Sequence, residues 1–63
     1  MGKQLIDSKA AASLLAIPLS DLLKLAKNRQ IAHYRFGHRL RFEVTDIQRF
    51  MAEMRIEREA KND

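Results

Sequence analysis

Apolar residues recur along this chain first at the 3.6-residue period of a helix, then with the alternation of a strand, and then again at the helical period. In the first part, Ala11, Leu14 and Leu15 follow the i, i+3, i+4 spacing of a buried helical stripe. We expect a first helix over residues 9–16, after a short apolar entry segment. Ser8 is its expected N-cap, because a serine hydroxyl can accept a hydrogen bond from a first-turn N–H.

A second helix is expected to begin at Pro18. The residue before a proline is pushed out of the helical region, whereas proline is tolerated in the first turn of a new helix. Asp21 in that turn complements the helix dipole. Leucine and alanine supply more apolar surface than one face needs, so we expect this helix to be wedged between the first helix and the segment that follows. Its outer face is left with Lys24, Lys27 and Asn28.

Two alternating segments then flank a turn that contains Gly37, and we expect them to form a β-hairpin. Glycine readily supplies the positive φ that a tight hairpin turn commonly requires. Successive side chains on a strand point to opposite faces, which places Leu40 and Phe42 on one face. Arg39 and Arg41 fall on the other face, so the alternation separates a core surface from a basic one.

The helical period returns after the hairpin, with Ile47, Phe50, Met51 and Met54 at helical spacing. The chain beyond is mostly charged, and we expect residues 52–63 to form a charged C-terminal helical extension. The element order is therefore helix, turn, helix, hairpin, helix. This order predicts a mostly α fold with a small β-hairpin, a winged helix-turn-helix.

The positive charge is concentrated in one part of the chain. The 63 residues are enough for one small domain, which we expect to span residues 1–63, and they carry a net charge of +4. Residues 22–42 hold six bases and no acid, whereas residues 1–21 hold two of each and residues 43–63 hold four bases and six acids. A block of one sign over the second helix and the hairpin favours a polyanionic partner.

Other classes of protein are not expected. The chain has no cysteine, and His33 and His38 have no third His or Cys nearby, so we expect no metal site and no cofactor. It shows no nucleophile with a base and an orienting acid and no phosphate-binding loop, so we expect neither an enzyme nor catalytic residues. The longest apolar run is too short to span a membrane or to act as a secretory signal, and we expect a cytoplasmic protein.

The segment AAASLLAIPLSDLLKLAKNRQIAHYRFGHRLRFEVTDIQRF resembles the small MerR-like helix-turn-helix domains of the phage excisionase family, the recombination directionality factors. The likeness runs over about residues 5–51. Its most specific part is the spacing of Ile31, Tyr34, Arg35, Gly37, Arg39, Leu40, Arg41 and Phe42, preceded by Ala10, Ala11, Leu14 and Leu15. The resemblance implies that the second helix enters the major groove of DNA. It also implies that the hairpin is a wing against an adjacent minor groove or the phosphate backbone.

This assignment gives two sets of candidate DNA-binding residues. The recognition helix would contribute Leu19, Ser20, Lys24, Lys27 and Asn28. The wing would contribute Arg35, His38, Arg39 and Arg41, because guanidinium groups at a hairpin tip can enter a narrow minor groove or bind phosphate. Ser20 has an equal claim to be a first-turn cap, and Arg35 to lie over Tyr34.

Several positions differ from the family pattern. Ala16 and Arg29 stand where glycine is usual, Pro18 stands where a capping serine is common, and Ala32 stands where proline is frequent. Asp21 stands in the tip of the recognition helix, where many relatives carry threonine. Its carboxylate would repel phosphate, so it caps the helix, accepts a hydrogen bond from a cytosine amino group, or points away.

The resemblance implies a specific role. Several copies would bind neighbouring sites on double-stranded attachment-site DNA in the bacterial host, bend it, and direct a phage integrase toward excision. A small phage or plasmid transcription regulator with the same fold is the alternative. A protein-interaction adaptor that docks through its C-terminal helix is a third hypothesis. In the excisionase role and in the adaptor role, Met54, Ile56 and Arg58 are candidates for contact with a partner protein.

Overall fold

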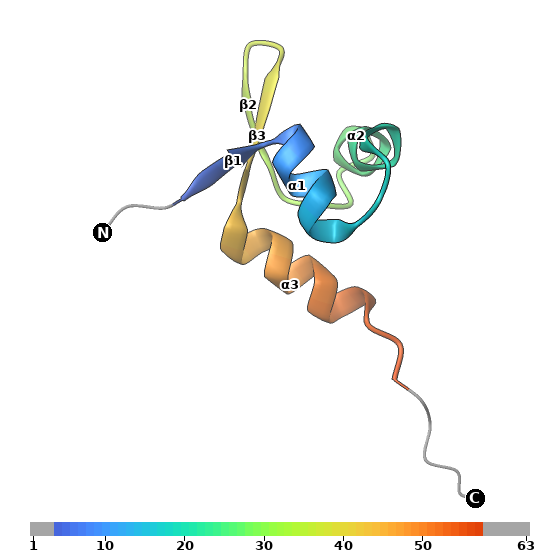
Figure 1. Ribbon diagram of the computed structural model, residues 1–63. Coiled ribbons are helices and arrows are strands. Elements are labelled where there is room, and N and C mark those ends of the chain that lie inside the picture. Colours follow the sequence, from blue (N-terminus) through green and yellow to red (C-terminus); the bar gives the residue numbers. More distant parts are fainter. Residues whose placement is uncertain (1–3, 58–63) are drawn as a thin grey trace, which may run out of the picture.

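The computed structural model describes residues 4–57 and contains three helices and a small antiparallel sheet (Figure 1). This arrangement confirms the expected winged helix-turn-helix fold. In chain order the elements are β1 (Leu5–Asp7), α1 (Ser8–Leu15), α2 (Leu19–Lys27), β2 (Tyr34–Phe36), β3 (Arg39–Glu43) and α3 (Val44–Met54).

The sheet has three strands in the order β1-β3-β2, rather than the two of a simple hairpin. The predicted hairpin supplies β2 and β3. The apolar entry segment forms β1, which pairs antiparallel with β3 so that Ile6 lies opposite Phe42. This third strand was not expected from the sequence. At the base of the wing β3 therefore pairs with β1 on one side and with β2 on the other, so β3 is the central strand.

α1 begins one residue earlier than expected, at Ser8, and its N-cap is Asp7 rather than Ser8. The backbone of Asp7 is extended (φ −83°, ψ 176°), and its Oδ1 accepts a hydrogen bond of 2.8 Å from the N–H of Ala10. Asp7 also ends β1, so the same residue terminates the strand and starts the helix. Aspartate and serine are comparable N-caps, so the residue types alone favour neither, and strand pairing decides between them.

The buried face of α1 consists mainly of alanine. Ala11 and Ala12 are 0% and 5% exposed, and the small side chains let the helix backbone approach its neighbours closely. Leu15 is partly buried against the core. Leu14, expected in the buried stripe, is 52% exposed, which corrects that prediction.

The hydrophobic core draws on every helix, on β3 and on the loop before β2. α2 packs against α1 and lies at the side of the domain, so it is not wedged against the hairpin as expected (Figure 1). Phe42, Leu22 and Ile47 are the largest fully buried side chains. The complete buried cluster is Ala11, Ala12, Leu22, Ala26, Ile31, Phe42 and Ile47.

α3 ends at Met54, and residues 55–57 are not helical. The Arg55 backbone is extended (φ −68°, ψ 128°). The predicted helical extension over residues 52–63 therefore stops after its first three residues within the described part. The rest of it, including Arg58, lies outside the described residues. Within residues 4–57, no helix is long and apolar enough to cross a membrane.

Candidate nucleic-acid interface

α2 presents a polar stripe on the side opposite its buried residues. Leu22 and Ala26 are 0% and 3% exposed, and they fix which side of the helix faces the core. Ser20, Lys24 and Lys27 are exposed and follow one another at i, i+4 and i+7, which places them on one line along the outer face. Three of the five predicted recognition-helix residues therefore share a single surface.

The other two candidates lie at the ends of α2. Leu19 is the first helical residue and is 39% exposed, while Asn28 is the exposed C-cap. Pro18 is the N-cap and has no capping side chain, although its carbonyl accepts from the N–H groups of Asp21 (3.0 Å) and Leu22 (3.2 Å). Asp21 is exposed in the first turn and lies about 100° around the helix from Ser20.

The hairpin projects beyond the helices, on the side of the domain away from α3 (Figure 1). Phe36 pairs with Arg39, so the turn at its tip consists of only Gly37 and His38. Gly37 has a φ of +68°, and a Cβ there would meet nothing within 4 Å. Glycine is therefore favoured by the backbone conformation of the turn and not by close packing.

The register distributes the cations of the wing over both faces of the hairpin. Arg39 and Arg41 lie opposite Phe36 and Tyr34, on the face away from Phe42. Arg35 lies opposite Leu40, on the face that carries the core further down the sheet. Arg35, His38 and Arg39 are all exposed, and they form the basic tip of the wing.

Arg41 differs from the other candidates in the wing. It lies in the middle of β3, between Asp7 of β1 and Tyr34 of β2, and it is only partly exposed. Its Nη1 donates a hydrogen bond of 2.7 Å to the carbonyl of Leu40. The expectation that both arginines lie at the hairpin tip is therefore corrected for Arg41, which lies on the sheet behind it.

Two aromatic residues on the outer face of the wing were not among the predicted site residues. The rings of Tyr34 and Phe36 are stacked, with centroids 6.2 Å apart and planes 3° apart. The Tyr34 hydroxyl donates to Glu43 Oε2 over 2.6 Å, while Phe36 is 56% exposed. The signal in the sequence was the alternation of Tyr34 and Phe36 along one strand. Phe36 is also next to the turn and lies between Arg35 and Arg39 in the chain.

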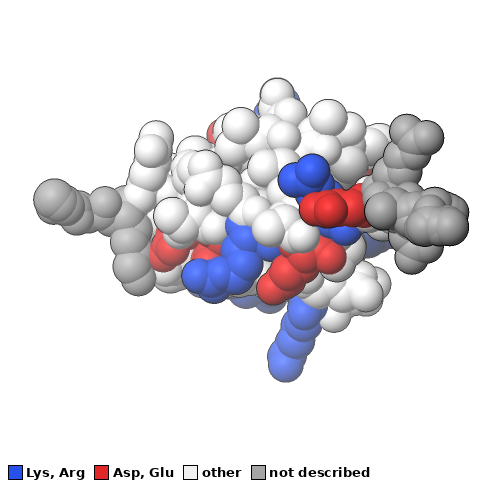
Figure 2. Space-filling model, turned by 90° about the horizontal axis from the view of Figure 1, so that it is seen from below, with Lys and Arg blue, Asp and Glu red and all other residues white. Residues whose placement is uncertain are grey.

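The surface around α3 has a different charge pattern. Arg49 lies 3.6 Å from Asp46, and Arg55 lies 3.6 Å from Glu57. The view from this side shows Lys and Arg intermixed with Asp and Glu among uncharged residues (Figure 2). The acid-free segment, residues 22–42, instead covers α2 after its first turn, the loop that follows and the wing up to Phe42.

The two histidines, His33 and His38, have different surroundings. His33 Nδ1 is 2.9 Å from the carbonyl of Ile31, and its ring lies 6.1 Å from that of Phe42, so His33 supports the packing. His38 is exposed in the turn. The described part of the chain contains no group of three or more His, Cys, Asp or Glu side chains able to hold a metal ion.

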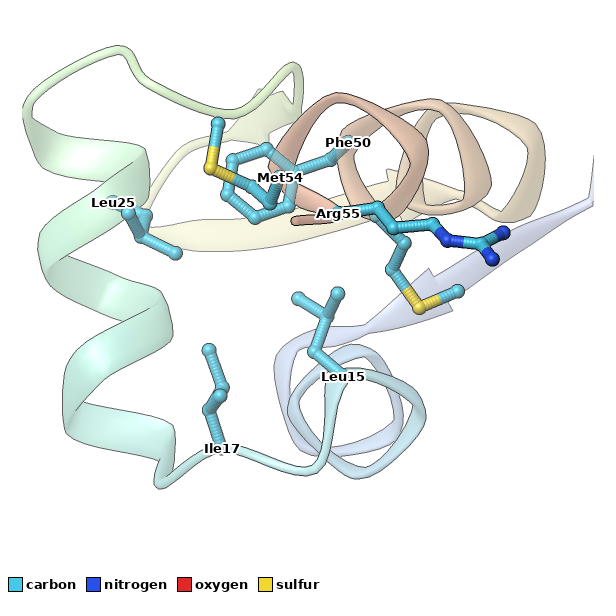
Figure 3. Close-up of a pocket in the computed structure, with 7 residues that line it drawn as sticks. Leu15, Ile17, Leu25, Phe50, Met54 and Arg55 are labelled. Carbon is cyan, nitrogen blue, oxygen red and sulfur yellow. The ribbon is translucent and has the colours of Figure 1, made fainter. Parts of the chain in front are cut away.

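A shallow apolar groove of about 380 Å³ lies between the three helices. Leu25 of α2 points into it from one side, Phe50 and Met54 of α3 from another, and Leu15 and Ile17 from the end of α1 and the turn (Figure 3). Met54, a partner-contact candidate, lines this groove and is 58% exposed. Ile56, another such candidate, is 95% exposed, and contact of either with a partner stays a prediction.

Comparison with known proteins identifies the family. No curated protein and no solved structure matches the chain significantly. The model of a helix-turn-helix domain family matches residues 5–55, which include every helix and strand described above. The chain therefore belongs to this helix-turn-helix domain family and is a DNA-binding protein.

Proposed function

We propose that this protein is an architectural DNA-binding protein of the excisionase type, which acts on attachment-site DNA in the cytoplasm of a bacterial host. It binds that DNA sequence-specifically and cooperatively, bends it and directs a phage integrase toward excision. The observation that carries the proposal is the position of the acid-free segment: its six bases all lie on α2, on the wing or in the loop between them.

The geometry of α2 suits the major groove. A recognition helix reads base edges mainly through residues near its N-terminus, while residues further along contact the backbone. Ser20 lies in the first turn of α2 and Lys27 in its last, on the same exposed stripe. In the proposed complex, Ser20 faces a base edge and the two lysines contact phosphates.

The wing suits the minor groove because it carries cations on both of its faces. A minor groove is bordered by phosphates on both sides, and its narrow form concentrates negative potential. Arg35 on one face and Arg39 on the other can each approach one of the two strands, with His38 at the tip. Arg41, held against the Leu40 carbonyl, contacts the backbone behind them or stabilises the sheet.

Cooperative binding compensates for a small footprint. A helix and a wing of this size bury roughly 600–1,000 Å² on DNA, which gives modest affinity to one copy. Neighbouring copies on adjacent sites raise the occupancy. Excision is then favoured by the shape of the DNA, and the protein needs no chemistry of its own.

A salt-dependent gel shift tests the DNA interface. The probe is a duplex selected by the protein from a random-sequence pool, compared with an unselected duplex. Six bases bound to phosphate give a log–log slope of at most about −5, and Arg35→Gln with Arg39→Gln should flatten it by roughly 2. Arg49→Gln with Arg55→Gln is the matched control, since these exposed bases lie on or just after α3. Binding that is weak and insensitive to salt would contradict the interface.

A recombination assay tests the role itself. Purified integrase and paired attachment sites from the same genome are incubated with and without this protein, and excision is expected only in its presence. Excision that proceeds equally without it would overturn the excisionase proposal. A promoter reporter that responds without integrase would instead support the alternative, a small transcription regulator.

A further inference from the structure

Phe36 is the last residue of β2, directly before the turn at the tip of the wing. It is 56% exposed and is absent from both the core cluster and the residues packed against it. Phe42 on the same hairpin is 0% exposed, so the hairpin already supplies one aromatic anchor to the fold. The ring of Phe36 is therefore available to a ligand.

We infer that Phe36 is an apolar wedge, which enters the minor groove with the wing, partly unstacks one base step and produces the bend in the DNA. This inference rests on the proposed function, which requires bending but assigns it to no residue. Apolar side chains inserted from the minor groove kink a duplex away from the protein, and phenylalanine is one of the residues that does so.

The ring is supported from behind. Its plane is 3° from that of Tyr34, and the Tyr34 hydroxyl is held by Glu43 at 2.6 Å. Glu43 also accepts a hydrogen bond of 3.0 Å from the Thr45 hydroxyl at the start of α3. A wedge must resist the bases that it separates, and this chain of contacts connects Phe36 through Tyr34 to the body of the domain.

The neighbours of Phe36 match the chemistry of a duplex. Arg39 is its cross-strand partner, Arg35 precedes it on the opposite face, and His38 is at the tip. An apolar ring framed by cations fits a ligand whose stacked bases lie between two rows of phosphates. Phenylalanine donates and accepts no hydrogen bonds, so it cannot read base edges. We therefore expect a preference for steps that unstack easily, such as TA and CA/TG.

The test compares Phe36→Ala and Phe36→Leu with Leu14→Ala, which removes an exposed apolar side chain from α1 instead of from the wing. The selected duplex carries a fluorophore at each end, so energy transfer reports the bend, and 2-aminopurine at successive steps reports unstacking. The parent should shorten the end-to-end distance and brighten one step. Phe36→Ala should lose most of both signals and bind about tenfold more weakly, since one aromatic contact to a base is lost.

Phe36→Leu should retain a substantial part of the bend, because leucine also acts as a wedge. Leu14→Ala should match the parent. A bend unchanged in Phe36→Ala, or a parent that binds without unstacking any step, would overturn the wedge while leaving DNA binding intact. A parent that fails to bind the duplex would overturn the proposed function and the wedge together. Circular dichroism verifies that each variant is folded. If Phe36→Ala is unfolded, Phe36→Leu is compared with the parent instead, and equal bends with no unstacked step in either protein would exclude the wedge.

Discussion

The Tyr34 hydroxyl donates a hydrogen bond to Glu43 Oε2 over 2.6 Å, from the first residue of β2 to the last residue of β3. Tyr34 lies opposite Arg41, so the bond runs diagonally across the base of the wing. Glu43 is followed directly by α3. The contact thus connects the wing to the start of the helix that carries Ile47 into the core.

Tyr34→Phe should therefore lower the free energy of unfolding by about 1–2 kcal/mol, because the Glu43 carboxylate loses a partly buried partner. Urea unfolding followed by circular dichroism measures this loss. Thr45→Val is the comparison, since its exposed contact with Glu43 should matter less. Equal stability of Tyr34→Phe and the parent would show that the hydrogen bond makes no net contribution.

Ala16→Gly should stabilise the protein. Ala16 ends α1 in the left-handed conformation (φ 57°, ψ 41°), where its N–H binds the carbonyls of Ala12 and Ser13. That conformation costs a residue with a Cβ about 1–2 kcal/mol, and the extra freedom of glycine in the unfolded chain offsets part of the gain. We expect a net increase of about 0.5–1 kcal/mol in urea unfolding. Ala10→Gly, inside the same helix, should instead lower stability by about 1 kcal/mol.

Arg29 occupies a second left-handed position (φ 58°), just after α2. Arg29→Gly should also raise stability by about 0.5–1 kcal/mol, while it removes one base from the proposed interface. Arg29→Asn loses the same charge but tolerates this conformation less well than glycine, so its gain should be smaller. Thermal unfolding of the two variants and the parent measures their order of stability. A gain that is equal in both variants would assign the effect to charge rather than to backbone strain.

The strongly periodic parts of the fold were predictable from the sequence. Pro18 and Gly37 marked the turn between helices and the tip of the hairpin, although α2 begins at Leu19, one residue later than expected, with Pro18 as its N-cap. The alternation of β3 correctly placed Phe42 toward the core. The stripe of cations on α2 followed from helical spacing once the apolar positions were assigned. These features depend on local spacing, which a single sequence contains.

The features that were missed depend on tertiary contacts. β1 has only three residues, too few to show an alternation, and it exists because Ile6 pairs with the distant Phe42. Arg41 was placed at the tip because two arginines alternate there, yet β1 makes its position the centre of the sheet. The expected extension contained no glycine or proline to end α3, so nothing local indicated the stop at Met54.

The N-cap of α1 can be assigned by mutation. Asp7→Ala should cost about 1 kcal/mol, because the Ala10 N–H loses the oxygen it donates to. Asp7→Asn should retain most of that stability, since asparagine is an equally good N-cap. Ser8→Ala should change little. Urea unfolding of the three variants makes the comparison, and a larger loss for Ser8→Ala than for Asp7→Ala would restore the cap expected from the sequence.

Ser20 and Lys27 on α2 are expected to make different kinds of contact with DNA. Ser20→Ala should relax the preference for one base pair without changing the salt dependence, because Ser20 lies in the first turn, where recognition helices contact base edges. Lys27→Gln should weaken binding to every sequence alike and flatten the log–log salt slope by about 1, as loss of one phosphate contact does. Binding to single-base variants of the selected duplex, measured over a range of salt, separates the two effects.

Lys9→Gln is the matched control, because Lys9 is an exposed base on α1 outside the proposed interface. Its salt slope and base preference should equal those of the parent. If Lys9→Gln and Lys27→Gln flatten the slope equally, the protein binds DNA through its overall charge and not through the face of α2. If only Lys27→Gln does so and Ser20→Ala alters the base preference, α2 lies in the major groove with its N-terminus toward the bases.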